Sequence, residues 1–430
     1  MNHFIGIKGS GMSALAQIMK TLGYEVQGSD IDKSFFTEKG LIEKNIPFYI
    51  YDENNINNGM NIVVGNAIKD DNPELIKAKK LNLKIYTYQE MIGKLIKNYK
   101  SIAVSGCHGK TTTTGLMAHI LNNTVGCNYL IGDGTGSAEP NNKLFVFEAC
   151  EYQRHFLSYY PYYIIITNIE LDHVDYYKDL EDIKSAYGKF AEQGKQIIAW
   201  GDDPNIRSLN LRNTIYYGLN ENNDIVAKNI KYNLNGINFE VYINKEFYAE
   251  FNLPFFGNHM LLNSLAAITI CYLENISKED IQKHIVTYPG VNRRFSEEKI
   301  GNTIIIDDYA HHPTEIKATI AAAKQKYPDK KLIVIFQPHT FTRTIELKNE
   351  FINELKQANK TYILDIHPAR EKQEDYPEVT AKILINNIPE AEHLTSEDIS
   401  KLVKYQNEVF LFLGANDLRP LENNFKNYLN

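Results

Sequence analysis

The sequence predicts an α/β protein with three domains, and three observations lead to this expectation. The chain has 430 residues, which at about 150 residues per domain is enough for roughly three domains. Short apolar segments of strand type alternate with amphipathic segments of helix type, as in parallel sheets with crossover helices. Changes of pattern near residues 98 and 297 divide this alternation. We therefore expect domains at residues 1–98, 99–297 and 298–430.

The first domain has the pattern of a Rossmann-like fold. Residues 3–7 and 24–28 are expected strands, and residues 13–23 form an amphipathic helix between them. The apolar segments 62–64 and 84–86 continue the alternation of strand and helix. This order predicts a parallel sheet covered by helices.

A glycine-rich loop follows the first expected strand. It reads G-I-K-G-S-G-M over residues 6–12, and Asp30 ends the second strand. The N-terminus of a helix after such a loop can hold a diphosphate. The spacing is G-x-x-G-x-G, whereas the dinucleotide fingerprint is G-x-G-x-x-G. The loop therefore indicates a ligand that carries a diphosphate, but not which one. A tight turn with a purely structural role is the alternative.

The second domain is expected to be a central P-loop, ATPase-like α/β domain with a small antiparallel β element. Its expected strands and helix are residues 101–105, 111–121 (the helix), 144–147, 163–167 and 195–200. Between residues 224 and 253 the pattern changes to an alternation of period two with Asn-Gly and Asn-Lys turns. That change indicates antiparallel hairpins within or beside the domain.

The strongest single signal is G-C-H-G-K-T-T-T at residues 106–113, between an apolar strand and a helix. Glycines let the backbone wrap a phosphate, Lys110 would hold the β- and γ-phosphates, and the Thr111 hydroxyl would ligate Mg²⁺. Two residues separate the glycines where the common P-loop has four, so a chance glycine-rich turn is the alternative. The register with the strand and the helix favours a nucleotide-binding loop.

Metal-ligating residue types follow two further strands of this domain. Glu148 comes after the strand at 144–147, and the segment T-N-I-E-L-D-H-V-D at 167–175 comes after the next one. Open α/β sheets bind ligands at the carboxyl ends of their strands. A carboxylate and the imidazole of His173 beside a P-loop suit Mg²⁺ or Mn²⁺. Taken alone, an acidic residue after a strand is more often a helix cap.

The third domain is expected to be a second Rossmann-like α/β domain. Its strands and helices are expected at residues 303–307, 313–327, 332–336, 345–358, 362–365 and 409–413, with two more helical stretches before the last strand. His311, His312 and Glu315 have the residue types of a metal cluster. Because Pro313 suits the first turn of a helix, a helix cap with ligand contacts is a better interpretation than a zinc site.

The composition argues against several classes of function. The net charge is −7, whereas binders of nucleic acid or of acidic membranes need a basic surface. No apolar run approaches the roughly 18 residues of a membrane helix, and the first residues lack the pattern of a signal peptide. The four cysteines are scattered, so disulfides and zinc ribbons are not expected. We expect a cytoplasmic protein, either a monomer or a weak homodimer, that binds neither nucleic acid nor membrane.

These residues resemble the Mur ligases, the ATP-dependent amide-forming enzymes of peptidoglycan synthesis, over nearly all of the chain. The matching motifs are G-x-H-G-K-T-T-T, the acidic residue after the next strand, T-N-I-x-x-D-H, and further segments at residues 257–263, 290–295, 307–315, 337–339 and 414–417. Within the family, G-x-x-G-S-G-M followed by G-S-D is most similar to members that add L-alanine to UDP-N-acetylmuramate. The segment F-E-A-C-E-Y at 147–152 looks like their Gram-positive variant.

The resemblance implies a role for each matched residue. ATP would contact Gly106, Cys107, His108, Gly109, Lys110, Thr111, Thr112, Asn263, Arg294 and Asp308. Two Mg²⁺ ions, replaceable by Mn²⁺, would be held by Thr111, Glu148 and His173, which with Lys110 form the implied catalytic set. The UDP-sugar would lie on Gly9, Ser10, Gly11, Met12, Asp30, Asn66 and Ala67. The amino acid or the muramoyl carboxylate would face His312, Arg343 and Arg370.

The activity implied is the ATP-dependent joining of L-alanine to the lactyl carboxylate of UDP-N-acetylmuramate through an acyl phosphate, which gives ADP and phosphate. An alternative within the family attaches a murein tripeptide to the same sugar nucleotide, but its first loop usually reads G-x-C-G-T-F-M. A nicotinamide-dependent dehydrogenase and a nucleotide switch without ligase chemistry are alternatives from other classes. Lys8, Cys107 and Met260 depart from the family pattern. Several members carry a carbamylated lysine, and that role stays unassigned here because Lys184 and Lys189 do not align well with it.

Overall fold

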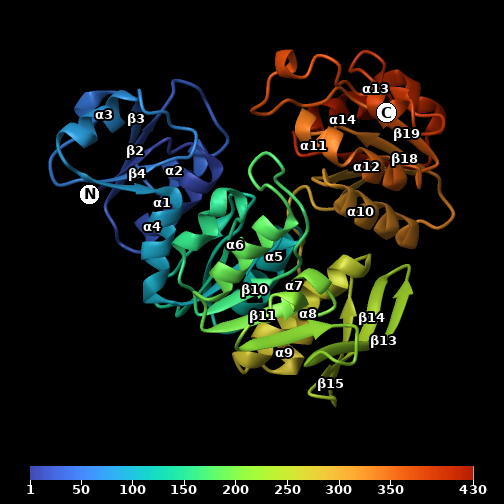
Figure 1. The fold of residues 1–430 in the computed structure, drawn as a ribbon, viewed down its shortest axis with the longest axis horizontal. Helices are drawn as coiled ribbons and strands as arrows, with labels where there is room; N and C mark the ends of the chain where they lie inside the picture. Colours follow the sequence, from blue (N-terminus) through green and yellow to red (C-terminus); the bar gives the residue numbers. More distant parts are fainter. Residues whose placement is uncertain (430) are drawn as a thin grey trace.

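The computed structural model describes residues 1–429, which form three α/β units, each built on its own sheet (Figure 1). The α/β class and the number of units agree with the sequence prediction. In the view of Figure 1, the N-terminal unit (blue) and the C-terminal unit (orange to red) lie on opposite sides above the central unit (green to yellow). Within the described residues, no helix combines the length and the apolar character needed to cross a bilayer.

The N-terminal unit has a five-stranded parallel sheet in the order β3-β2-β1-β4-β5. Its strands are β1 (Asn2–Ile5), β2 (Val26–Asp30), β3 (Phe48–Ile50), β4 (Asn61–Val64) and β5 (Lys84–Thr87), and its helices are α1 (Ser10–Thr21), α2 (Glu38–Glu43), α3 (Pro73–Lys80) and α4 (Tyr88–Leu95). Helix α1 begins at Ser10, three residues before the expected start at residue 13. The chain turns at Gly6, whose φ of 85° suits glycine, and the helix follows directly after Gly9.

The central unit has a ten-stranded sheet in the order β15-β14-β13-β12-β11-β10-β6-β9-β7-β8. Its strands are β6 (Lys100–Ser105), β7 (Cys127–Leu130), β8 (Gly136–Ser137), β9 (Leu144–Glu148), β10 (Tyr163–Ile166), β11 (Gln196–Trp200), β12 (Thr214–Gly218), β13 (Ile225–Asn233), β14 (Gly236–Ile243) and β15 (Glu246–Leu253). Its helices are α5 (Lys110–Asn122), α6 (Leu180–Ala191), α7 (Pro204–Ser208), α8 (Asn258–Leu273) and α9 (Lys278–Ile285). Strands β13, β14 and β15 form the expected antiparallel hairpins, and they extend the main sheet at one edge.

The C-terminal unit has a six-stranded sheet in the order β16-β17-β21-β18-β19-β20, parallel except for β16. Its strands are β16 (Ser296–Ile300), β17 (Thr303–Asp308), β18 (Leu332–Phe336), β19 (Lys360–Ile363), β20 (Glu392–His393) and β21 (Val409–Leu413), and its helices are α10 (Pro313–Lys326), α11 (Phe341–Glu346), α12 (Lys348–Leu355), α13 (Lys382–Ile385) and α14 (Arg419–Lys426). The single helix expected at 345–358 is instead the pair α11 and α12, because the chain leaves helical geometry at Leu347.

Strand β16 also bears on the boundary between the second and third units. The sequence placed that boundary at residues 297–298, which lies inside β16. Because β16 pairs with β17 of the third sheet, we propose that the third unit begins by Ser296.

The three units are joined in different ways. One hydrophobic cluster contains both N-terminal and central residues, among them Leu15 of α1, Ile92 of α4 and Phe145 of β9. The clusters that flank the C-terminal sheet contain C-terminal residues and, from the segment before it, Phe295. That unit meets the central unit through helix α10, which contacts α8 and β13, and through polar pairs described below. The N-terminal unit is thus fixed by apolar packing, whereas the C-terminal unit is held largely by charged contacts.

Candidate active site

The P-loop forms where β6 ends and α5 begins. Gly106 has a φ of 135°, and a Cβ there would collide with the Oγ1 of Thr167, so only glycine fits. Gly109 has a φ of 82° and precedes the first residue of α5. The amides at the N-terminus of α5 thus point at one spot with a partial positive charge, which suits an anion.

Lys110 lies at the centre of this loop. Its Nζ donates to the carbonyl oxygens of Gly106 at 2.6 Å and Cys107 at 3.1 Å, and it lies 2.9 Å from the Oε2 of Glu151. Glu151 is fully buried. Burial alone would raise the pKa of Glu151, but the charges of Lys110 and His173 lower it below its ordinary value. The Glu151 carboxylate therefore balances the charge of Lys110 within the loop.

The other predicted metal-ligating residues surround Lys110 in two groups. Thr111 donates from Oγ1 to the Oε2 of Glu148 at 2.8 Å. The Nε2 of His173 lies 3.1 Å from the Oε1 of Glu151, and ligand atoms of Glu151, Asp172 and His173 all lie within 4.8 Å of one another. The structure thus brings the four predicted catalytic residues together, and it adds two carboxylates to them.

Sequence reasoning did not single out Glu151 or Asp172. Both belong to segments that matched the family motifs, yet neither stands directly after a strand. Glu151 follows β9 by three residues and precedes a short 3₁₀ helix (Tyr152–Ser158). They are recognised only in the structure, where Glu151 is buried beside Lys110 and Asp172 is buried beside Arg343.

A cavity of about 450 Å³ lies between the central and C-terminal units. Six of the predicted ATP-binding residues line it, namely His108, Gly109, Thr112, Asn263, Arg294 and Asp308. Phe255, Phe256 and Tyr288 supply aromatic surface to its wall. A mainly apolar pocket with a few convergent polar groups, next to a phosphate loop, fits a base and a ribose.

Two carboxylates on the C-terminal side of the cavity are held by specific partners. Asp308 accepts hydrogen bonds from the backbone N–H groups of Phe295 and Ala310, each at 2.8 Å. Burial raises the pKa of Asp308 to about 6, although the nearby charge of Arg294 opposes the rise. Arg294 also lies 3.5 Å from Glu315, which completes the capping box at the start of α10.

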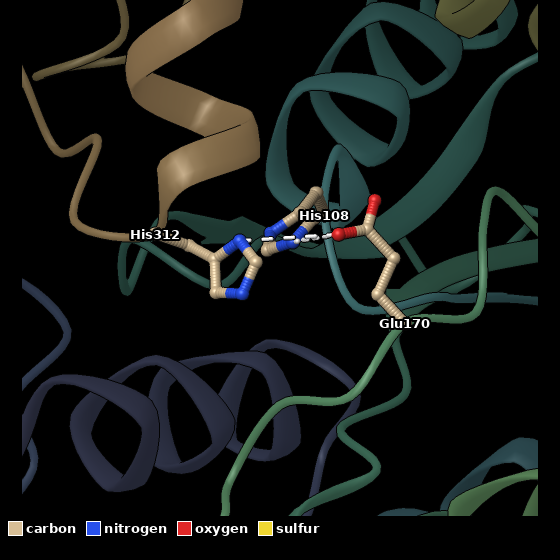
Figure 2. A group of neighbouring side chains, drawn as sticks. All are labelled: His108, Glu170 and His312. Carbon is tan, nitrogen blue, oxygen red and sulfur yellow. Dashed lines mark ion pairs between the residues drawn. The ribbon is translucent and has the colours of Figure 1, made fainter. Parts of the chain in front are cut away.

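Figure 2 shows His108 of the P-loop beside Glu170 and His312. The Nε2 of His108 lies 3.7 Å from Glu170, and its Nδ1 lies 3.5 Å from Glu315 of the C-terminal unit. Burial lowers the pKa of His108, but the two carboxylates outweigh it and raise that pKa to about 10. His312 is the N-cap of α10, where it forms a capping box with Glu315. The helix-cap interpretation of His312 is therefore confirmed.

The two predicted amino-acid-binding arginines both reach across to the central unit. Arg343 of α11 donates from Nη2 to Asp172 at 2.7 Å, and both side chains are buried. Arg370 pairs with Asp175 and stacks over the ring of Tyr152. Both arginines thus meet the segment that follows β10, close to His173.

The predicted UDP-sugar residues lie at the carboxyl ends of β1, β2 and β4. The backbone N–H of Lys8 donates to Asp30 at 2.7 Å, so the glycine loop closes on that carboxylate. Ser10 touches the central unit at Gly134. The side chain of Met12 is buried in the hydrophobic core.

The predicted UDP-sugar site lies close to the predicted ATP site. Asn66 accepts a hydrogen bond from Gln89 at 3.2 Å, with Ala67 next to it in the chain. The loop between β7 and β8 touches Ser10 through Gly134 and Glu148 through Gly132. The loop between β7 and β8 therefore lies next to both the first glycine loop and Glu148, the partner of Thr111.

Comparison with protein families gives three matches in chain order. Residues 2–100 match the Mur ligase family catalytic domain, residues 104–271 the Mur ligase middle domain, and residues 293–416 the Mur ligase glutamate ligase domain. Together they cover most of the chain.

Individual proteins agree with the family matches. The chain is 46% identical over 424 residues to a UDP-N-acetylmuramate–L-alanine ligase of Lactiplantibacillus plantarum, covering 98% of this chain and 97% of the relative. The same name applies to a Levilactobacillus brevis protein, 46% identical with coverage of 99% and 97%. Among solved structures, a UDP-N-acetylmuramate–alanine ligase of Thermotoga maritima matches with a TM-score of 0.80 and 27% identity, covering 99% and 98% of the chains. A murein peptide ligase of Psychrobacter arcticus shares the fold, with a TM-score of 0.71 and 22% identity, covering 100% and 98% of the chains.

Proposed function

We propose that this chain, which belongs to the Mur ligase family, joins L-alanine to the lactyl carboxylate of UDP-N-acetylmuramate at the expense of ATP. The observation that carries the proposal is the 46% identity, over essentially the whole chain, to two curated ligases of that name. The loop between β7 and β8 supports it, because this loop touches both Ser10 and Glu148 and the reaction needs both nucleotides at one centre.

The chemistry follows from the reactivity of the groups that must be joined. A carboxylate is a poor acylating agent, so an oxygen of the lactyl carboxylate attacks the γ-phosphorus of ATP, and ADP leaves. The acyl phosphate that results is attacked at its carbonyl carbon by the neutral amine of L-alanine. The C–O bond to phosphate breaks, inorganic phosphate leaves, and the amine nitrogen gives up one proton to the phosphate or to solvent as the amide forms. The protein contributes mainly by positioning and by neutralising charge, as in other phosphoryl transfers.

Lys110 and the amides of the P-loop are the groups that we assign to the phosphates. The ammonium already lies within the loop, bonded to the carbonyl oxygens of Gly106 and Cys107. When ATP binds, its γ-phosphate competes with Glu151 for this charge. We assign the remaining contacts to the base, ribose and phosphates from the cavity, with Asn263, Arg294 and Asp308 as the polar groups.

The donor set beside the P-loop fits divalent magnesium. The hydroxyl of Thr111 and the carboxylate of Glu148 are hard oxygen ligands in direct contact, and His173 lies with Glu151 and Asp172 in a second group. We propose that Thr111 and Glu148 hold one Mg²⁺ and that His173 holds another, for which Mn²⁺ can substitute. Ions held by these residues would supply positive charge that neutralises the phosphates during the transfer.

The remaining ligands are assigned to the units on either side. Gly9, Ser10, Gly11, Asp30 and the Asn66–Ala67 turn would hold the UDP portion in the N-terminal unit. Arg343 and Arg370 would face the amino acid or the muramoyl carboxylate from the C-terminal unit. Since each arginine already pairs with an aspartate of the central unit, the same contacts keep the C-terminal unit closed and exclude water from the acyl phosphate.

The experiment that tests the proposal is phosphate release from ATP with UDP-N-acetylmuramate. L-alanine, glycine, L-serine and L-Ala-γ-D-Glu-meso-diaminopimelate are compared as acceptors. We expect release with L-alanine and less with the other amino acids. Phosphate release with the tripeptide and with no single amino acid would favour the recycling reaction. If none of the four acceptors gave phosphate release, both ligase reactions would be rejected.

A further inference from the structure

A tyrosine at the start of α4 belongs to none of the contacts assigned above. Tyr88 is the first residue of α4 and follows the capping residue Thr87. Thr87 and Glu90 form a reciprocal capping box, with hydrogen bonds of 3.2 and 2.8 Å. Because this cap fixes the helix start at the carboxyl end of β5, it also fixes where the Tyr88 ring leaves the chain.

The ring points toward the glycine loop of the same unit. A Cβ placed on Gly11 would lie 2.8 Å from the Tyr88 hydroxyl, so the phenol reaches directly against the start of α1. The loop from the central unit that touches Ser10 and Glu148 reaches the same helix start from the other unit. Burial raises the pKa of Tyr88, and the charge of nearby Glu148 adds to the rise. The phenol therefore stays protonated and is a hydrogen-bond donor.

The Tyr88 side chain is half-buried, and its ring packs against the hydrophobic cluster shared by two units. Within the described residues, its hydroxyl is not one of the fully buried polar atoms without a partner, so this end of the side chain is open to water or to a ligand. A tyrosine at such a boundary packs its apolar ring against the protein and keeps its polar end available. Because the phenol lies between the glycine loop and Glu148, it can donate to a ligand that passes between them.

We propose that Tyr88 donates a hydrogen bond to the muramoyl portion of UDP-N-acetylmuramate. The proposal rests on the proposed function, since it needs a substrate with its diphosphate on the Gly9–Gly11 loop and its carboxylate near Glu148. Tyr88 lies between these two ends. This hydrogen bond would let Tyr88 distinguish the sugar nucleotide from UDP and would guide the lactyl group toward the P-loop.

The test compares Tyr88→Phe with wild type, because this change removes the hydroxyl and keeps the ring. We expect the KM for UDP-N-acetylmuramate to rise about 3- to 10-fold, as for one lost hydrogen bond. The KM values for ATP and L-alanine, and kcat, should stay within about twofold. Tyr86→Phe is the matched control, since the Tyr86 hydroxyl is engaged by Lys94 and it should change none of these values.

Calorimetric titration without ATP keeps the proposal falsifiable if the variant is less stable. Tyr88→Phe should bind UDP-N-acetylmuramate about 3- to 10-fold more weakly and UDP with unchanged affinity. Equal affinities of variant and wild type for UDP-N-acetylmuramate would overturn the proposal, and so would an equal loss for UDP. Failure of the wild type to bind UDP-N-acetylmuramate would instead reject the proposed function.

Discussion

The ion pairs of His108 predict a specific dependence of stability on pH. The pKa of His108 is raised from 6.5 to about 10, which corresponds to a ceiling of about 5 kcal/mol of stability. The folded protein then holds one more proton than the unfolded chain between these two values. Its contribution is complete below pH 6.5, and it is lost as the pH rises toward 10.

The expected slope can be worked out from the same geometry. One extra bound proton gives a loss of about 1.4 kcal/mol per pH unit, or nearly 3 kcal/mol between pH 7 and 9. At 3.7 and 3.5 Å, the contacts of His108 with Glu170 and Glu315 are ion pairs longer than a good hydrogen bond. We therefore expect a smaller loss, about 2 kcal/mol of unfolding free energy between pH 7 and 9.

The assay is urea unfolding followed by the fluorescence of Trp200, the single tryptophan, which lies in the central unit beside the same cavity. Other groups also titrate between pH 7 and 9, so the measured quantity is the difference in slope between wild type and His108→Gln. Between pH 7 and 9, the unfolding free energy of His108→Gln should fall by about 2 kcal/mol less than that of the wild type. His393→Gln should keep nearly the wild-type slope, because the pair of His393 with Asp365 is exposed to solvent and therefore weak. Equal slopes for wild type and His108→Gln would refute the reasoning.

Three further substitutions test other parts of the site. Lys110→Ala should abolish turnover, since the γ-phosphate loses its cation, while calorimetry should show binding of UDP-N-acetylmuramate nearly unchanged; loss of that binding would contradict the division of labour between the units. Gly106→Ala should lower the melting temperature and remove ATP binding, because the new Cβ meets Thr167, and a variant that binds ATP normally would show that the loop tolerates a side chain. Arg343→Ala should destabilise the protein by about 3–5 kcal/mol in urea unfolding, because it leaves Asp172 buried and unpaired. The double variant with Asp172→Leu should recover much of this loss, and failure to recover would argue against the pair as its cause.

The sequence was most informative where a backbone requirement or a periodic pattern is local. The glycines of the P-loop, the alternation that gives the parallel strands and the period-two hairpins of β13–β15 all follow from short-range chemistry. The start of α1 and the split at Leu347 were missed, because helix ends depend on single residues in their tertiary setting.

The candidate site was predictable only in part. The motifs indicated Lys110 and Glu148, but no local pattern indicated that Glu151 is buried against the lysine. Similarly, the pairing of Arg343 with Asp172 joins residues far apart in the chain. Such contacts depend on how one unit is placed on another, which no local pattern encodes.

The most direct test of the proposed chemistry follows the carboxylate oxygen. UDP-N-acetylmuramate labelled with ¹⁸O in its lactyl carboxylate is incubated with ATP, L-alanine and the protein, and the phosphate released is analysed by mass spectrometry. Because the carboxylate attacks the γ-phosphorus and the amine then displaces phosphate, we predict one ¹⁸O atom in the phosphate and one in the new amide. Amide product accompanied by unlabelled phosphate would contradict the acyl phosphate and the arrangement of the site from which it is inferred.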